Sequence, residues 1–118
     1  MLDKKNRITK QKEFDAFFGR EFKQKKGRNT AGQLLIVKCF NNGIDNPRFG
    51  FIISNKIDKR ATGRNKIKRQ LREIIRLKLD KLKIKNDCLI IVKSAIKDKE
   101  YLVIEKELIY LLKQVGLL

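Results

Sequence analysis

Histidine is absent from this 118-residue sequence, and acidic residues are few, with 13 Asp and Glu in total. Without histidine the chain lacks the usual general base, the Ser-His triads and the common zinc sites. The carboxylates stand singly along the chain rather than in a cluster. These absences predict a protein with no catalytic residue and no metal site of its own.

Cysteine is also scarce: Cys39 and Cys88 are the only two, and both fall in apolar stretches. They are expected to be small buried hydrophobic residues of a reducing compartment. The longest apolar runs, 34–37 and 88–92, fall short of the roughly 20 residues that a membrane span needs. No apolar stretch follows the charges of the first five residues, so we expect no secretory signal and a cytoplasmic location.

Positive charge dominates what is present, with 30 Lys and Arg and a formal net charge of +17. Residues 1–85 hold 25 basic and 8 acidic residues, whereas residues 86–118 hold 5 of each. Such an excess opposes compaction unless a polyanion is the working partner. Nucleic acid is the first candidate for this partner, and an anionic membrane surface is the second.

Apolar periodicity predicts elements in the order α-β-β-β-α-β-α. The expected helices span about 10–20 with Thr9 as its cap, about 59–83 with Asp58 as its N-cap, and about 101–115. The expected strands span 33–40, 48–54 and 88–92, while 23–29 forms an irregular edge strand or a loop. A turn region between the first two strands predicts that they form a hairpin.

These elements predict an α/β (α+β) two-layer sandwich, in which about three helices pack on a small, mostly antiparallel sheet. One core can form at this length without disulfides or metals. We therefore expect a single domain over residues 1–118.

The segment 64–76 carries an apolar stripe beside a cationic strip. At 100° per residue, Ile67, Leu71, Ile74 and Ile75 share an arc of roughly 100°, the side expected to face the core. Beside it lie Arg64, Asn65, Lys68, Arg69 and Arg72, with Lys66 further round. Like charges at i, i+4 destabilise an isolated helix by a few tenths of a kcal/mol per pair. A phosphate backbone explains the strip better than an ordinary solvated face does, although charge alone does not distinguish DNA from RNA.

The central residues resemble the bacterial ribonuclease P protein component. They are Gly50-Phe51-Ile52-Ile53-Ser54-Asn55-Lys56 and Arg64-Asn65-Lys66-Ile67-Lys68-Arg69-Gln70-Leu71-Arg72-Glu73. The pair Arg7-Ile8 before an aromatic-bearing segment, the strand 88–92 followed by Lys93, and the C-terminal helix extend the resemblance over nearly the whole chain. Asn55, Lys66, Gly63 and the long turn 58–60 depart from the family pattern.

The resemblance implies the protein subunit of a ribonucleoprotein endonuclease that removes the 5′ leader of precursor tRNA. The RNA subunit would carry the chemistry, with Mg²⁺ held mainly by that RNA and the substrate. The implied partners are the ribonuclease P RNA subunit and precursor tRNA, with no DNA and no membrane. The family fold also implies a left-handed βαβ crossover, against the strong right-handed preference of such units.

The same resemblance assigns two groups of site residues by position. The RNA subunit would be bound by Arg64, Asn65, Lys66, Lys68, Arg69 and Arg72. The leader cleft would be lined by Phe14, Phe18, Ser54, Lys56 and Lys93.

Some of these residues also have plain structural interpretations. Ser54 could be a strand-end cap and Lys93 a solvated strand-end lysine, and Phe14, Phe17 and Phe18 could together form a core stripe. A base stacked on an aromatic ring gains roughly 1–3 kcal/mol. Because the two longer helices already give the sheet apolar cover, and because aromatic platforms suit a single-stranded leader, we expect Phe17 to be mainly core and Phe14 and Phe18 to line the cleft.

Three other functions are alternatives, and only the central motif separates the first of them from the ribonuclease P interpretation. A small basic ribosomal or other structural RNA-binding protein would share the charge and the lack of catalytic groups. A nuclease acting alone would need Asp45, Asp58, Glu73 or Asp80 to hold a metal, and these are scattered. Binding to a membrane surface would call for interfacial aromatics that the basic helix lacks.

Overall fold

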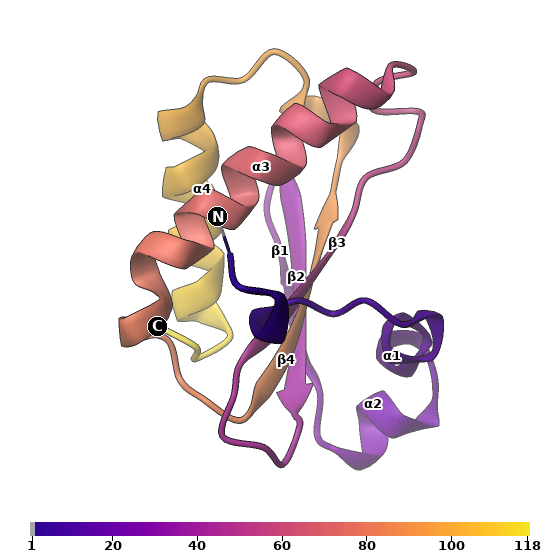
Figure 1. Ribbon diagram of the computed structural model, residues 1–118, viewed down its shortest axis with the longest axis vertical. Helices are drawn as coiled ribbons and strands as arrows, with labels where there is room; N and C mark the ends of the chain where they lie inside the picture. Colours follow the sequence, from indigo (N-terminus) through magenta and orange to yellow (C-terminus); the bar gives the residue numbers. More distant parts are fainter. Residues whose placement is uncertain (1) are drawn as a thin grey trace.

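The computed structural model describes residues 2–118, so residue 1 of the expected domain lies outside it. A four-stranded sheet forms the middle of the molecule (Figure 1). Its strands are β1 (Arg28–Ala31), β2 (Leu35–Asn41), β3 (Arg48–Ile52) and β4 (Asn86–Val92). The α-helices are α1 (Gln11–Asp15), α2 (Arg20–Gln24), α3 (Ala61–Lys78) and α4 (Tyr101–Gln114). The mixed α+β class and the order of elements are confirmed.

Strand β4 lies in the interior of the sheet, whose order is β1-β2-β4-β3. It pairs antiparallel with β2 and parallel with β3, so the predicted hairpin between 33–40 and 48–54 is wrong. The residues of β4 are buried on both faces, as expected for a central strand covered on both sides. The hairpin that does form joins β1 to β2. The parallel pair and α3 make a βαβ unit, and its left-handed crossover stays a prediction.

Helices α3 and α4 cover one face of the sheet (Figure 1). The predicted apolar positions of both helices and of the strands meet there in one cluster. Its fully buried members include Leu35, Val37, Cys39, Leu71, Ile75, Cys88, Ile90, Leu108 and Leu112. After α3 a short 3-10 turn, η3 (Leu79–Lys81), leads to the buried Leu82.

The other face of the sheet is covered in part by the N-terminal helices (Figure 1). In place of one helix over 10–20, the chain forms α1 and a 3-10 turn, η2 (Ala16–Phe18). Gly19 is extended and separates them from α2, which takes up the start of the segment 23–29, expected to be an edge strand or a loop. Phe17 is fully buried and packs on Phe40 with ring centroids 4.8 Å apart. Thr9 is not the cap: Lys10 holds the N-cap position, and Glu13 Oε1 accepts its backbone N–H at 3.1 Å.

The start of α3 also differs from the expectation. Arg60 occupies the N-cap position, two residues after Asp58. Asp58 Oδ1 accepts the backbone N–H of Arg60 at 2.9 Å, which makes a turn ahead of the helix rather than a cap on its first turn. The helix therefore begins at Ala61.

The N-terminal segment, residues 2–8, runs beside the free edge of β3. Arg7 bridges to Phe49 in the parallel sense, and the backbone N–H of Ile8 donates to the Phe49 carbonyl at 2.9 Å. Leu2 is buried in the core on the α3 side, which places this segment next to α3. Across residues 2–118 no helix combines the length and the hydrophobicity that crossing a bilayer requires.

Candidate nucleic-acid interface

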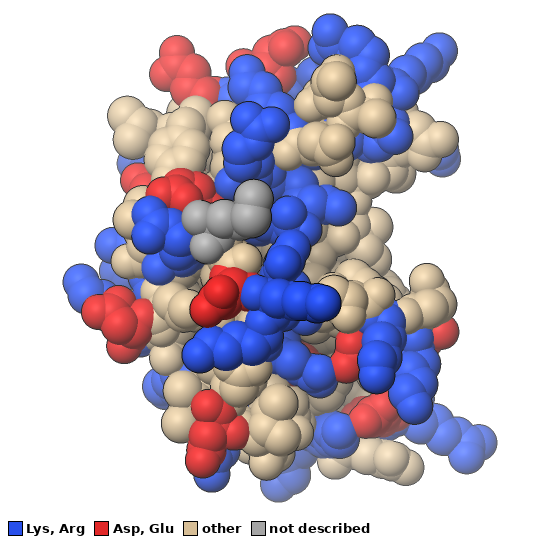
Figure 2. Space-filling model, in the orientation of Figure 1, with Lys and Arg blue, Asp and Glu red and all other residues tan. Residues whose placement is uncertain are grey.

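A cationic surface covers α3 and the adjacent N-terminal segment. Figure 2 shows Lys and Arg side chains gathered across the middle of this face, with only isolated Asp and Glu among them. Four of the six predicted RNA-subunit residues meet here around one shallow depression that Glu73 also borders. They are Asn65, Lys68, Arg69 and Arg72. Within residues 2–118 none of the three cations forms an ion pair with an acidic side chain.

The other two predicted residues lie elsewhere. Arg64 is half-buried, and its Nη1 donates to the carbonyl oxygens of Asp58 and Lys59 at 2.8 and 3.0 Å. It therefore fastens the turn that precedes α3. Lys66 lies on the opposite flank of the helix, where it lines a separate hollow with Lys97. The six predicted residues are close together in the sequence, but the helix places them on different surfaces.

Arg7 is a cation of this surface that the candidate residues did not include. The Nε atoms of Arg7 and Arg72 are both buried, and neither has a hydrogen-bond partner among the described residues. Burial and, secondly, the charge of Arg7 lower the pKa of Arg72 below its usual value. Two guanidinium groups whose charges interact, with no ion-pair partner among the described residues, form a suitable site for a bridging phosphate. In the sequence, only the family resemblance drew attention to Arg7, as part of the pair Arg7-Ile8.

The aromatic residues of the N-terminal helices form a second candidate surface on the other side of the sheet. Phe14 and Phe18 line a shallow depression of about 310 Å³. Gln11, Asp15, Phe51 and Ile52 complete its lining. Phe18 is 59% exposed, whereas Phe14 is half-buried against the sheet. Phe18 therefore lies outside the core, whereas Phe14 packs against the small buried cluster that contains Phe17 and also borders the depression.

Lys38 provides a cation beside these aromatic rings, and the candidate residues did not include it either. Its Nζ lies 4.4 Å from the ring centroid of Phe18 and 5.0 Å from that of Phe22. It also donates to the carbonyl oxygen of Phe17 at 3.2 Å. The sequence showed only that Lys38 interrupts one face of an otherwise apolar strand. It did not indicate which aromatic residues would surround this lysine.

Ser54, Lys56 and Lys93 follow the carboxyl ends of the neighbouring parallel strands β3 and β4. They therefore lie toward one end of the sheet, but none of them lines the aromatic depression. The Nζ of Lys93 donates to the Gly32 carbonyl at 2.9 Å, in the β1–β2 turn. The Ser54 carbonyl accepts the N–H of Ile57 at 3.0 Å, and the side chains of Ser54 and Lys56 are exposed.

The remaining candidate groups are dispersed or buried. Asp45 pairs with Lys85, Asp58 with Arg60 and Glu73 with Arg76, and these carboxylates do not converge. Across residues 2–118 no three His, Cys, Asp or Glu side chains form a group that could hold a metal ion. Cys39 and Cys88 are fully buried, as predicted, and burial raises the pKa of both thiols.

Comparison with known proteins agrees with this arrangement. The family model described as Ribonuclease P matches residues 2–116. The ribonuclease P protein component of Syntrophomonas wolfei is 38% identical over 117 residues, which cover 99% of this chain and 92% of that protein. That of Clostridium botulinum strain Loch Maree is 36% identical, with 97% of each chain covered.

Solved structures give the same result. A mutant of the Staphylococcus aureus RNase P protein superposes with a TM-score of 0.83 at 32% identity, covering 96% of this chain and 90% of that one. The Thermotoga maritima RNase P protein superposes with a TM-score of 0.79 at 25% identity, covering 93% and 97%. The whole-chain family match, the relatives and the shared fold show that this chain belongs to the ribonuclease P protein family and is a protein subunit for tRNA 5′ processing.

Proposed function

We propose that this chain binds the ribonuclease P RNA subunit through α3 and the N-terminal segment, and the 5′ leader of precursor tRNA through the aromatic depression. The observation that carries the proposal is the group of cations around one depression on α3, with Arg7 beside Arg72. Because the Lys and Arg side chains of this depression have no ion-pair partner among the described residues, an external polyanion would stabilise the folded protein. RNA supplies this partner as a continuous run of phosphates.

The leader site is supported by a different set of contacts. Phe18 exposes an aromatic ring beside the Lys38 ammonium group, and Phe14 lies next to it in the same depression. Single-stranded RNA binds to surfaces that combine aromatic platforms with cations. Lys56 and Lys93 lie toward one end of the sheet, where they extend the positive charge available to leader phosphates.

In this proposal the RNA subunit carries the chemistry. The dispersed carboxylates of the chain do not fit a dedicated magnesium site, so we place Mg²⁺ on the RNA subunit and substrate. The chain contributes affinity: it binds the RNA subunit on one surface and the leader on another. The place of action is the cytoplasm, where precursor tRNA is processed.

Reconstitution tests the proposal. The chain is mixed with the ribonuclease P RNA of its host, and 5′ cleavage of a precursor tRNA is measured at low magnesium concentration. We expect cleavage at the mature 5′ end under conditions in which the RNA alone is slow, and no cleavage by the chain alone. A second measurement identifies the RNA that copurifies with the chain from its host. Ribosomal RNA in place of ribonuclease P RNA would contradict the proposal.

A further inference from the structure

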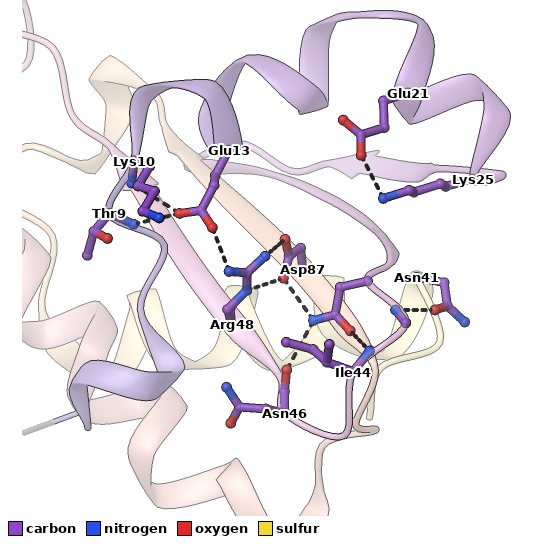
Figure 3. Close-up of polar contacts among 12 residues, drawn as sticks. Thr9, Lys10, Glu13, Glu21, Lys25, Asn41, Ile44, Asn46, Arg48 and Asp87 are labelled. Atoms are coloured by element: carbon purple, nitrogen blue, oxygen red, sulfur yellow. Dashed lines mark hydrogen bonds and ion pairs between the residues drawn. The ribbon is translucent and has the colours of Figure 1, made fainter.

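Arg48 of β3 joins α1 to the middle of the sheet (Figure 3). Its Nη1 donates to Glu13 Oε2 at 2.6 Å, while its Nε and Nη2 donate to Asp87 Oδ1 and Oδ2 at 2.9 and 2.7 Å. The side chain of Asp87 is only 4% exposed and also accepts a hydrogen bond from Asn42 at 2.9 Å. β4 therefore holds the guanidinium group in a fixed orientation, with Nη1 directed toward α1.

Glu13 connects the fixed guanidinium group of Arg48 to the first turn of α1. One carboxylate oxygen accepts from Arg48, and the other accepts the backbone N–H of Lys10 at 3.1 Å. An α-helix of five residues does not persist by itself, because nucleation is unfavourable and few backbone hydrogen bonds follow it. The place of α1 on the sheet therefore depends on contacts of this kind.

The contacts between α1 and β3 follow a register along one face of the strand. Arg48 contacts Glu13, and Gly50, two residues on, lies under Phe14. A Cβ at residue 50 would come within 2.8 Å of the Phe14 ring, so glycine is what allows the ring to lie there. The next residue on this face, Ile52, lines the depression together with Phe14 and Phe18.

We propose that Arg48 and Glu13 are positioning residues for leader recognition. Their ion pair fixes α1 against β3, so that Phe14 and Phe18 face a single-stranded leader in a defined arrangement. Neither Arg48 nor Glu13 lines the depression itself. This inference rests on the proposed leader site and adds that affinity for the leader depends on two residues outside it.

Glu13→Gln is the most informative variant. Replacement of Arg48 would leave the buried Asp87 without its bidentate partner, which is strongly destabilising. Glu13→Gln keeps the side-chain shape and leaves the Arg48–Asp87 pair in place. Glu21→Gln is the matched control, because it removes the exposed 2.6 Å ion pair with Lys25 on α2 and changes the net charge by the same amount.

The experiment measures the affinity of the reconstituted holoenzyme for a precursor tRNA with a leader and for mature tRNA. We expect Glu13→Gln to weaken precursor binding by about threefold to tenfold, less than the full effect of one charge-assisted hydrogen bond, because the Gln amide oxygen can still accept from Arg48. Binding of mature tRNA and of the RNA subunit should not change. Glu21→Gln should leave the ratio of the two tRNA affinities at its original value.

A double-mutant cycle distinguishes positioning from general stabilisation. If Glu13 acts through Phe14, Glu13→Gln has little further effect on precursor binding once Phe14→Ala is present. Three results would overturn the positioning role but not the leader site. They are full additivity of the two substitutions in precursor binding, an equal loss of affinity for both tRNAs in Glu13→Gln, and an unchanged ratio of the two tRNA affinities in Glu13→Gln. An unchanged ratio in Phe14→Ala would overturn the leader site at Phe14 and this inference with it.

Discussion

The carboxylate of Asp58 occupies the space that a side chain at residue 63 would need. A Cβ on Gly63 would lie 1.9 Å from Asp58 Oδ2. Asp58 also accepts the N–H of Arg60, and its carbonyl oxygen accepts from Arg64 Nη1 at 2.8 Å. The long turn 58–60 and the glycine in the first turn of α3, two departures from the family pattern, are therefore one structural feature.

Gly63→Ala should destabilise the protein although alanine favours helices by roughly 1 kcal/mol over glycine. The added methyl group must displace Asp58, and overpacking of this kind costs about 1–3 kcal/mol. Urea denaturation measures the change. Asp58→Ala combined with Gly63→Ala should lose less than the sum of the single variants, and simple additivity would show that the two residues do not compete for space.

Arg69→Ala should weaken binding to the RNA subunit and flatten its salt dependence. Arg69 is exposed on the α3 depression and has no acidic partner among the described residues. Loss of one phosphate contact reduces the slope of log affinity against log salt by roughly 0.7–0.9. Lys113→Ala, an equal charge change on α4, is the control. Equal slopes for Arg69→Ala and the unaltered chain would remove Arg69 from the interface.

Arg7→Met should reduce the stabilisation that multivalent anions give to the free protein. Binding of an anion to the folded state alone raises stability by about 2.7 kcal/mol at 100 times its Kd. The charge of Arg7 acts on Arg72 and lowers its pKa, so sulfate or pyrophosphate bound between them should raise the melting temperature relative to chloride. The rise should shrink in Arg7→Met and persist in Lys4→Met, an exposed control on the same segment. The same rise in both variants would place the anion elsewhere.

Phe18→Ala should weaken binding of precursor tRNA while leaving mature tRNA and protein stability nearly unaffected. Its ring is 59% exposed, so little buried area is lost, whereas a stacked base would lose roughly 1–3 kcal/mol. Holoenzyme affinities for both tRNAs measure the effect. Tyr110→Ala, at an equally exposed aromatic residue on α4, is the control and should change neither affinity. A large fall in melting temperature would instead indicate that the Phe18 ring is part of the core.

Acid should weaken the attachment of α1. Burial alone would raise the pKa of Glu13, but hydrogen bonds from the Lys10 backbone and from Arg48 outweigh it, so that its pKa lies below the ordinary 4.5. A lowered carboxyl pKa adds stability that is present above pH 4.5 and is lost as the pH falls through the folded-state value. Unfolding free energy should therefore decline less between pH 5 and pH 3 in Glu13→Gln than in the unaltered chain. Parallel curves would show that this carboxylate makes no such contribution.

Much of the fold followed from local patterns in the sequence. The apolar stripe of α3 and the alternation in β2 place Leu71, Ile74, Ile75, Leu35 and Val37 in the core, and all are buried. The position of β4 could not be read in this way, because strand neighbours are set by long-range packing. Adjacent strands in sequence favour a hairpin, and here the doubly buried β4 separates them instead.

The candidate site shows the same division. Helical periodicity places Lys68, Arg69 and Arg72 on one surface of α3, where the structure has them. Arg7 and Lys38 were missed because their importance comes from side chains distant in sequence: Arg72 for the first, and Phe18 and Phe22 for the second. The binding roles of all the candidate residues, Ser54, Lys56 and Lys93 included, stay predictions.

The interior position of β4 also determines when the strands can pair while the chain is being synthesised. The sheet gives β3 no partner strand except β4 among residues 2–118, and the whole of α3 is translated between the two. While residues 86–92 are still unmade, the backbone of β3 and one edge of β2 have no strand to pair with. Pairing between segments so far apart is intrinsically slow. The time that a ribosome needs for residues 53–92 is thus the shortest time for which the apolar β3, with Phe49 and Phe51, is open to contacts with other chains.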